Sequence, residues 1–127
     1  MTNVPPDLRY AKTHEWVRVS GGTATVGITD HAQHELTDVV FVELPAVGRQ
    51  VKAGEACAVV ESVKTASDIY SPVGGHVAEV NQAAVDNPAL VNSEPYGQGW
   101  LYKIKLSNPA EANDLLSPDA YAAQIGQ

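Results

Sequence analysis

The sequence predicts a mainly β fold, an antiparallel sandwich or flattened barrel with little helix. Its 10 glycines and 8 prolines divide the 127-residue chain into short segments. The segments between these breaks are rich in valine, which favours strands. The chain length is close to the commonest domain size, so we expect one domain that covers residues 1–127.

The first half of the chain contains a hairpin, a helix and a strand. Residues 15–20 and 23–28 are predicted to form a β-hairpin, because Gly21-Gly22 between them supplies the positive φ of a tight turn. A short helix is expected from Asp30, since Gln33 follows it at the spacing of a capping box. Residues 38–44 (DVVFVEL) form the next strand, which Pro45 ends.

The second half contributes four more strands. They are expected at residues 56–62, 66–70, 76–80 and 100–106, and only residues 63–65 (VKT) connect the first two. In the last strand one side is apolar, and its members are Trp100, Tyr102, Ile104 and Leu106.

Two further helical segments are expected in this half. Asn87-Pro88 favours a brief helical turn that continues to Val91. Ser117-Pro118 favours a C-terminal helix at residues 119–125. The apolar side of this helix consists of Tyr121, Ala122 and Ile125.

The charge of the chain excludes two classes of partner. It has 8 Lys and Arg against 15 Asp and Glu, for a net charge of -7. Nucleic acids and anionic membranes attract basic surfaces, so neither is expected as a partner. An acidic chain is drawn instead to a basic patch on another protein. No Lys or Arg occurs between Lys64 and Lys103, so Lys64 borders a stretch whose only charges are negative.

The single cysteine and the N-terminal segment indicate the cellular compartment in which the protein works. Cys57 has no partner for an internal disulfide, and its apolar neighbours predict a buried side chain. No apolar run reaches membrane-spanning length. The N-terminal residues lack the apolar core of a secretory signal and the Arg- and Ser-rich character of a transit peptide. We therefore expect a cytoplasmic protein, or one that has already been processed.

Lys64 lies where two apolar strands meet in a tight connection. A lysine is costly to bury, so its side chain is expected to point outward. A turn at the end of two packed strands is rigid at its base and exposed at its tip. Such a turn suits a covalently attached group, although a solvated lysine is its commoner occupant.

The segment around Lys64, ESVKTASDIYSPVGG at residues 61–75, resembles the lipoyl-attachment segment of the glycine cleavage system H proteins. Further stretches resemble the same family in the same order, and together they span residues 10–106. They are HEWV at 14–17, VGITDHAQ at 26–33, VVFVELP at 39–45, VN at 91–92, PYG at 95–97 and GW at 99–100. Each stretch is weak alone, and their joint match is specific.

The resemblance implies a fold and a cofactor. The fold is the lipoyl/biotinyl-type antiparallel β-sandwich (barrel-sandwich hybrid) with a few short helices, including a C-terminal one. The cofactor is lipoic acid, joined by an amide to the amine of Lys64 on an arm of about a dozen ångströms. Proteins of this family are carriers rather than enzymes, so no catalytic residue is expected.

The implied role is a shuttle among enzymes. The carrier takes an aminomethyl group from a pyridoxal-phosphate glycine decarboxylase to a tetrahydrofolate-dependent aminomethyltransferase, and then passes electrons to dihydrolipoamide dehydrogenase. The tether raises the local concentration of the carried group at each enzyme. A lipoylating enzyme is the fourth implied partner, and we expect the carrier itself to be a monomer.

Four residues besides Lys64 are candidates for the site. Glu61 is implied in recognition by the lipoylating enzyme. Asp68 is expected to meet the protonated amine of the loaded arm, because a carboxylate pairs with such a group away from bulk water. The resemblance adds Glu15, with Thr13 beside it, as a second wall of a shielding cleft.

Two residues depart from the family's pattern. Thr37 stands where a Leu-Gly-Asp turn has glycine, and His76 stands where an acidic or other polar residue is more usual. Neither touches the Lys64 motif, so they bear on local turn geometry.

Other chemistry has little support in the sequence. Zinc could be held by His14, Glu15, His31 and His34, but their spacing is loose and there is no His-Glu-x-x-His run, so no metal site is expected. No Gly-x-Ser-x-Gly turn supports a serine hydrolase, and no glycine-rich loop supports a phosphate site.

Three rival carriers or modules share the lysine turn. Biotin-accepting sequences usually have methionine on both sides of the lysine, where this chain has Val63 and Thr65. Lipoyl domains of 2-oxoacid dehydrogenases usually have aspartate before the lysine and long linkers. A lipoyl-relay or interaction module without a glycine cleavage role stays open, because Lys64 would serve either role.

Overall fold

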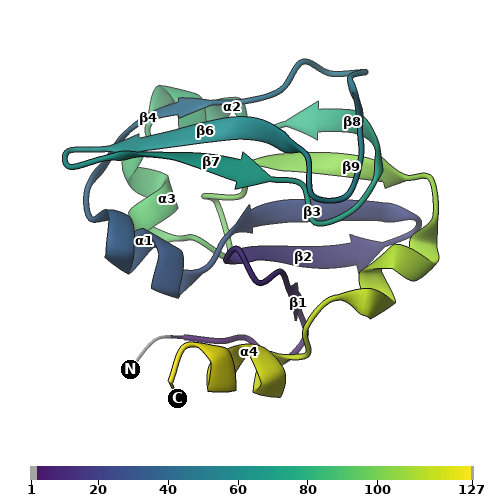
Figure 1. Cartoon of the computed structure of the whole chain (residues 1–127). Helices are drawn as coiled ribbons and strands as arrows, with labels where there is room; N and C mark the ends of the chain where they lie inside the picture. The colour runs from purple at the N-terminus through teal and green to yellow at the C-terminus, as the bar shows by residue number, and fades with distance from the viewer. Residues whose placement is uncertain (1–2, 127) are drawn as a thin grey trace.

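The computed structural model describes residues 3–126, in which short strands are interspersed with short helices (Figure 1). The strands are β1 (Arg9–Tyr10), β2 (Glu15–Ser20), β3 (Thr23–Ile28), β4 (Val39–Glu43), β5 (Gln50–Val51), β6 (Ala56–Ser62), β7 (Ala66–Tyr70), β8 (Gly75–Val80) and β9 (Tyr102–Leu106). The helices are α1 (Asp30–Leu36), α2 (Gln82–Asp86), α3 (Ala89–Ser93), the 3-10 helix η1 (Pro109–Asp114) and α4 (Pro118–Gln124).

The strands form two antiparallel sheets that enclose one main hydrophobic core. One sheet has six strands in the order β1-β2-β3-β9-β8-β5, and the other has three in the order β4-β6-β7. The core between them is built from alternate strand residues, among them Val26, Val60 and Ile104, which are fully buried. The mainly β sandwich expected from the sequence is confirmed.

The two predicted hairpins are confirmed. β2 and β3 pair in register around Gly21 and Gly22, whose φ angles of 58° and 80° are those of a tight hairpin turn. β6 and β7 pair from Ala56↔Tyr70 to Glu61↔Ala66. Both hairpins follow from short connections between strand-forming runs, which a sequence displays directly.

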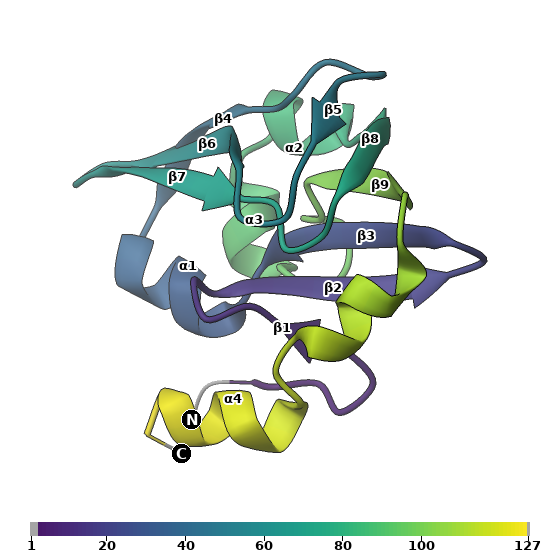
Figure 2. The ribbon, with the colours of Figure 1, turned by 45° about the vertical axis from the view of Figure 1, so that its right-hand side comes forward.

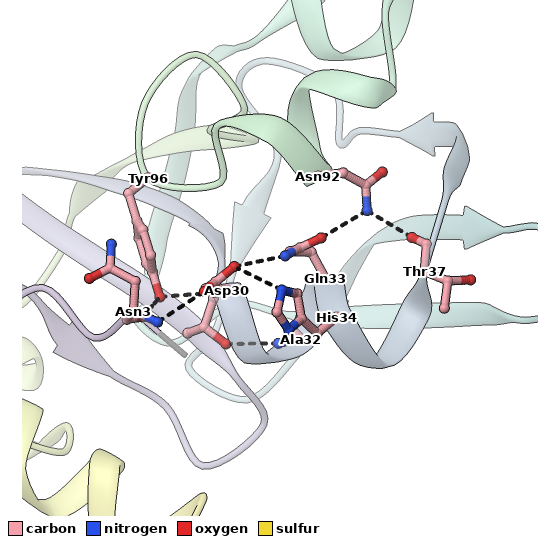
Figure 3. Close-up of polar contacts among 9 residues, drawn as sticks. Asn3, Asp30, Ala32, Gln33, His34, Thr37, Asn92 and Tyr96 are labelled. Carbon is pink, nitrogen blue, oxygen red and sulfur yellow. Dashed lines mark hydrogen bonds and ion pairs between the residues drawn. The ribbon is translucent and has the colours of Figure 1, made fainter. Parts of the chain in front are cut away.

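The helix after β3 begins as expected, but its cap differs from the prediction. Thr29 is the N-cap, and its hydroxyl accepts a hydrogen bond from the Ala32 amide at 3.2 Å. Asp30 is therefore the first helical residue, and its carboxylate accepts from the Gln33 side-chain amide at 2.7 Å (Figure 3). The capping-box interpretation of Asp30 was wrong because threonine is also a good cap and stands one residue earlier.

The end of α1 is held by Asn92 of α3. Its side-chain amide donates to the Gln33 side-chain oxygen at 3.0 Å and to the Thr37 carbonyl at 2.8 Å (Figure 3). Its oxygen accepts from the Val39 amide at 2.8 Å. Thr37 adopts φ 64° and ψ -147°, a conformation that favours glycine. The threonine that replaces the family's usual glycine at residue 37 is therefore strained in this turn.

The region between β8 and β9 differs from the expectation. The helical turn begins after Pro88, as α3, while Asn87 is the C-cap of a preceding helix, α2, that the sequence did not suggest. β9 begins only at Tyr102, because Trp100 packs in a second hydrophobic cluster. His76 is an exposed residue of β8 opposite Gln50 of β5.

The second cluster lies on the side of the six-stranded sheet away from the main core. It consists of Leu8, Tyr10, Trp16 and Tyr121, with partly buried residues around them. The predicted C-terminal helix is confirmed as α4 (Figure 1), and Ser117 is its N-cap. This helix supplies Tyr121 to the cluster. The Trp16 indole donates to the Pro95 carbonyl at 2.8 Å, which ties β2 to the segment before β9.

Cys57 is buried, as predicted, and burial raises the pKa of its thiol. Among residues 3–126, no helix has both the length and the hydropathy needed to cross a membrane.

Candidate functional site

The candidate site is the turn of residues 63–65, which joins β6 to β7. Figures 1 and 2 show this hairpin projecting beyond the rest of the sandwich. Its base is closed by the Ser62 amide, which donates to the Thr65 carbonyl at 2.7 Å. The Val63 amide donates to the Asp38 carbonyl at 3.0 Å, so the start of the turn is also fixed to the segment before β4.

Ser62 organises the turn from inside. Its side chain is buried, and its hydroxyl oxygen accepts hydrogen bonds from the amides of Lys64 at 3.3 Å and Thr65 at 3.2 Å. The same hydroxyl donates to the Thr65 carbonyl at 3.2 Å. A serine that binds amides two and three residues ahead rigidifies a turn. Ser62 was not among the residues predicted for the site, although a serine two residues before a turn lysine is the signal that indicates this role.

Lys64 is exposed at the tip of this rigid turn. Among the described residues its amine takes part in no ion pair and no hydrogen bond, so nothing in residues 3–126 holds the amine against the protein surface. Val63 beside it is also exposed, at 66%. The turn therefore fixes the backbone at Lys64 while leaving its amine accessible to an enzyme that would acylate it.

Glu61 and Asp68 lie on the side of the β6–β7 hairpin that faces away from the core. Glu61 is half-buried opposite Ala66, and Asp68 is exposed opposite Val59. Residues directly opposite each other, and residues two apart in one strand, share a face of the sheet. The structure thus brings both carboxylates to the face that ends at Lys64.

Glu15 lies in a different environment, since it is only 1% exposed. Its carboxylate accepts a hydrogen bond from the Thr13 hydroxyl and another from the Tyr70 amide, the latter at 3.2 Å. Loss of hydration on burial raises its pKa to about 7, although both hydrogen bonds favour the charged form. Glu15 therefore joins the start of β2 to the end of β7 from within the protein.

Thr13 and Asp68 meet at a small hollow beside β7. This hollow, of about 130 Å³, is lined by Thr13, His14, Ile28, Ala32, Glu35, Leu36, Ser67, Asp68 and Ile69. Glu15 is not among the residues that line it, and its carboxylate is linked to the hollow through the Thr13 hydroxyl. A larger hollow of about 490 Å³ lies at the other end of β7, around Tyr70 and Pro72, and Thr13 borders it as well.

The residues of the zinc alternative do not come together at one point: His14 and His31 are neighbours, but His34 lies elsewhere. His14 contacts the Tyr121 hydroxyl at 2.7 Å through Nδ1, and its ring centroid is 4.8 Å from that of His31. Burial and the neighbouring His31 lower the pKa of His14. His34 lies 3.7 Å from the Asp30 carboxylate instead. In the described part of the chain, no three His, Cys, Asp or Glu side chains are grouped as a metal site requires.

Comparisons with known proteins agree on one family. Residues 8–127 match the family model described as glycine cleavage H-protein. The chain is 60% identical to the glycine cleavage system H protein of Cronobacter sakazakii over 126 residues, which are 98% of both chains. It is 59% identical to the H protein of Escherichia coli, again over 98% of each chain.

A solved structure gives the same result at the level of the fold. The crystal structure of a glycine cleavage system H protein from Mycobacterium marinum superposes with a TM-score of 0.90 at 44% identity. The match covers 98% of the present chain and 100% of that chain.

Proposed function

The chain belongs to the glycine cleavage H-protein family and is a carrier protein of that system, and from this premise we propose that the Lys64 amine is its lipoyl attachment point. The observation that carries the proposal is the exposed Lys64 amine, which has no partner within residues 3–126, on a turn that Ser62 holds rigid. When attached, the lipoyl group supplies a cyclic disulfide, which provides redox and group-accepting chemistry. The protein supplies the fixed base from which this group reaches its enzymes.

The neighbouring residues have separate proposed roles. Glu61, three residues before Lys64 and half-buried on the same hairpin, is a recognition residue for the lipoylating enzyme. Asp68 and Thr13 border the hollow beside β7, where the Asp68 carboxylate would pair with a protonated amine carried on the arm. Glu15 supports this wall from behind by holding Thr13 and the end of β7.

The proposed partners are those of the glycine cleavage system. They are the pyridoxal-phosphate glycine decarboxylase, the tetrahydrofolate-dependent aminomethyltransferase, dihydrolipoamide dehydrogenase and a lipoylating enzyme. We propose that the chain supplies no catalytic residue and that residues 1–127 form a single carrier domain. One core shared by both sheets and a family match over residues 8–127 support the single domain.

The attachment point is tested with two lysine variants. Lys64→Arg should fold normally and show no gain of a lipoyl group by intact mass after incubation with a lipoylating enzyme and lipoate. The matched control is Lys52→Arg, since Lys52 is also an exposed turn lysine, and it should be lipoylated like the wild type. A lipoyl group on the Lys64→Arg chain would refute the assignment.

The glycine cleavage role is tested by reconstitution with the three enzymes of the cycle. The lipoylated wild type should support glycine cleavage, whereas Lys64→Arg should not. A fully lipoylated chain that supports no turnover would favour the lipoyl-relay module instead.

A further inference from the structure

The outward face of the three-stranded sheet carries exposed apolar side chains that no other part of residues 3–126 covers. Phe41 of β4 is 47% exposed, and Val40 beside it is 55% exposed. The pairing of β4 with β6 shifts between Val39 and Phe41, and this bulge leaves two consecutive apolar side chains accessible. Exposed apolar side chains that are grouped and rimmed by polar residues mark interaction sites, and Phe41 lies opposite Glu61, three residues before Lys64.

Three carboxylates surround these apolar side chains. Glu43 lies opposite Val59, which lies opposite Asp68, while Phe41 lies opposite Glu61. These five residues share one side of the sheet, because they are either directly opposite or two apart in a strand. We call them the outer face. A hollow of about 190 Å³, bordered by Glu43, Val59 and Asp68, indents it.

Cations are nearly absent from the outer face. Arg49 borders the hollow at the end of the face away from the turn, and it is paired with Glu55 at 3.0 Å. Lys64 stands at the opposite end, and acylation of its amine removes that positive charge. The lipoylated chain would therefore present an apolar centre with three free carboxylates around it.

The opposite side of the molecule carries mainly basic side chains instead of carboxylates. On the outward side of the six-stranded sheet, Arg18, Thr25 and Lys103 are aligned across β2, β3 and β9, and Lys105 follows two residues later. Glu79 lies opposite Lys103 there. The molecule is thus polarised, and a basic protein surface would be attracted to the side that displays Lys64.

We propose that the outer face is the docking surface for a partner enzyme whose own surface presents Lys or Arg residues around an apolar recess. Phe41 would enter the recess, and the three carboxylates would pair with the basic rim. This inference rests on the proposed function, because the face ends at Lys64 and a partner docked there has the arm within reach. The proposed function names the attachment point; this inference names the surface and the chemistry through which a partner enzyme binds the carrier.

The test compares two double variants with the same change in net charge. Phe41→Ala with Glu43→Lys alters the outer face without touching the arm-shielding residues. Val19→Ala with Glu79→Lys alters residues of the other sheet, where Val19 is 44% exposed and Glu79 is exposed. Thermal unfolding verifies that both variants are folded.

Dissociation constants are measured by isothermal titration calorimetry against the decarboxylase, the aminomethyltransferase and the dehydrogenase, each without substrate. The outer-face variant should bind at least one of them about tenfold more weakly than the wild type, and higher salt should narrow the difference. The control variant should stay within about twofold for that enzyme. Equal affinities of the two variants, or no wild-type binding to any of the three, would overturn the proposal.

Intact mass after lipoylation distinguishes a failure of the docking surface from a failure of the proposed function. Failure to lipoylate Lys64 would refute the attachment point, whereas a lipoylated chain with an insensitive outer face would refute the docking surface alone.

Discussion

Glu15 is predicted to make the stability of this protein fall as the pH rises from acid to neutral. Burial raises its pKa to about 7, against 4.5 for the solvated residue. Between these two values the folded chain holds a proton that the unfolded chain has released. The stabilisation is therefore fully present below pH 4.5 and is lost as the pH rises through about 7.

The size of the effect follows from the same two values. Each pH unit between them corresponds to about 1.4 kcal/mol, so the loss over the whole range from 4.5 to about 7 is about 3 kcal/mol. A domain of this size has about 5–15 kcal/mol of stability in total. The ionisation of Glu15 therefore removes a large fraction of the stability of the folded state.

Glu15→Gln isolates this contribution. The amide oxygen can accept from the Tyr70 amide, and its NH₂ group can donate to the Thr13 hydroxyl, but the side chain cannot ionise. Urea unfolding of wild type and variant from pH 4 to 8.5 should give similar free energies of unfolding below pH 4.5. At pH 8 the variant should be the more stable by about 3 kcal/mol.

The design controls for other groups. The lowered pKa of His14 acts in the opposite sense, since it removes stability as the pH falls below the ordinary histidine value, but it is present in both proteins and cancels in the difference. Glu94→Gln removes an exposed carboxylate and should leave the wild-type pH dependence unchanged. Parallel curves for wild type and Glu15→Gln over the whole range would refute the reasoning.

Three further predictions concern single substitutions. Thr37→Gly should raise the free energy of unfolding by about 1 kcal/mol, because relief of the strain at φ 64° exceeds the entropy that glycine adds to the unfolded chain. A lower unfolding midpoint in urea would contradict this. Ser62→Ala should lower the free energy of unfolding by about 1 kcal/mol and slow the lipoylation of Lys64, because two turn amides lose their acceptor. The lipoylation rate is measured by intact mass at early times, and an unchanged initial rate would show that the turn needs no such support. Gly27→Ala should destabilise the fold by about 3 kcal/mol or more, since its new Cβ would lie 2.6 Å from the Trp16 indole nitrogen, and near-wild-type urea stability would show that the indole moves freely.

The β-hairpins and the lysine turn could be predicted because their determinants are local. Gly21-Gly22 fixes one turn, and the short connection between residues 56–62 and 66–70 fixes the other, which places Lys64 at a tip without any knowledge of distant residues. The C-terminal helix followed from Ser117-Pro118 in the same way. The two-residue strands β1 and β5 were missed, because so short a run has no period of its own and becomes a strand only when a neighbour pairs with it.

The amino-acid sequence alone thus determined that this chain is a β sandwich with Lys64 displayed on a hairpin turn, since turn residues and side-chain alternation act over a few positions. Only the tertiary structure decided the surroundings of that lysine. Glu15 binds Tyr70, which is 55 positions further along the chain, and Phe41 lies opposite Glu61 through a bulged register. Burial, pKa and the make-up of the outer face all depend on which strands pair and in what register, and this is settled by the packing of the whole core.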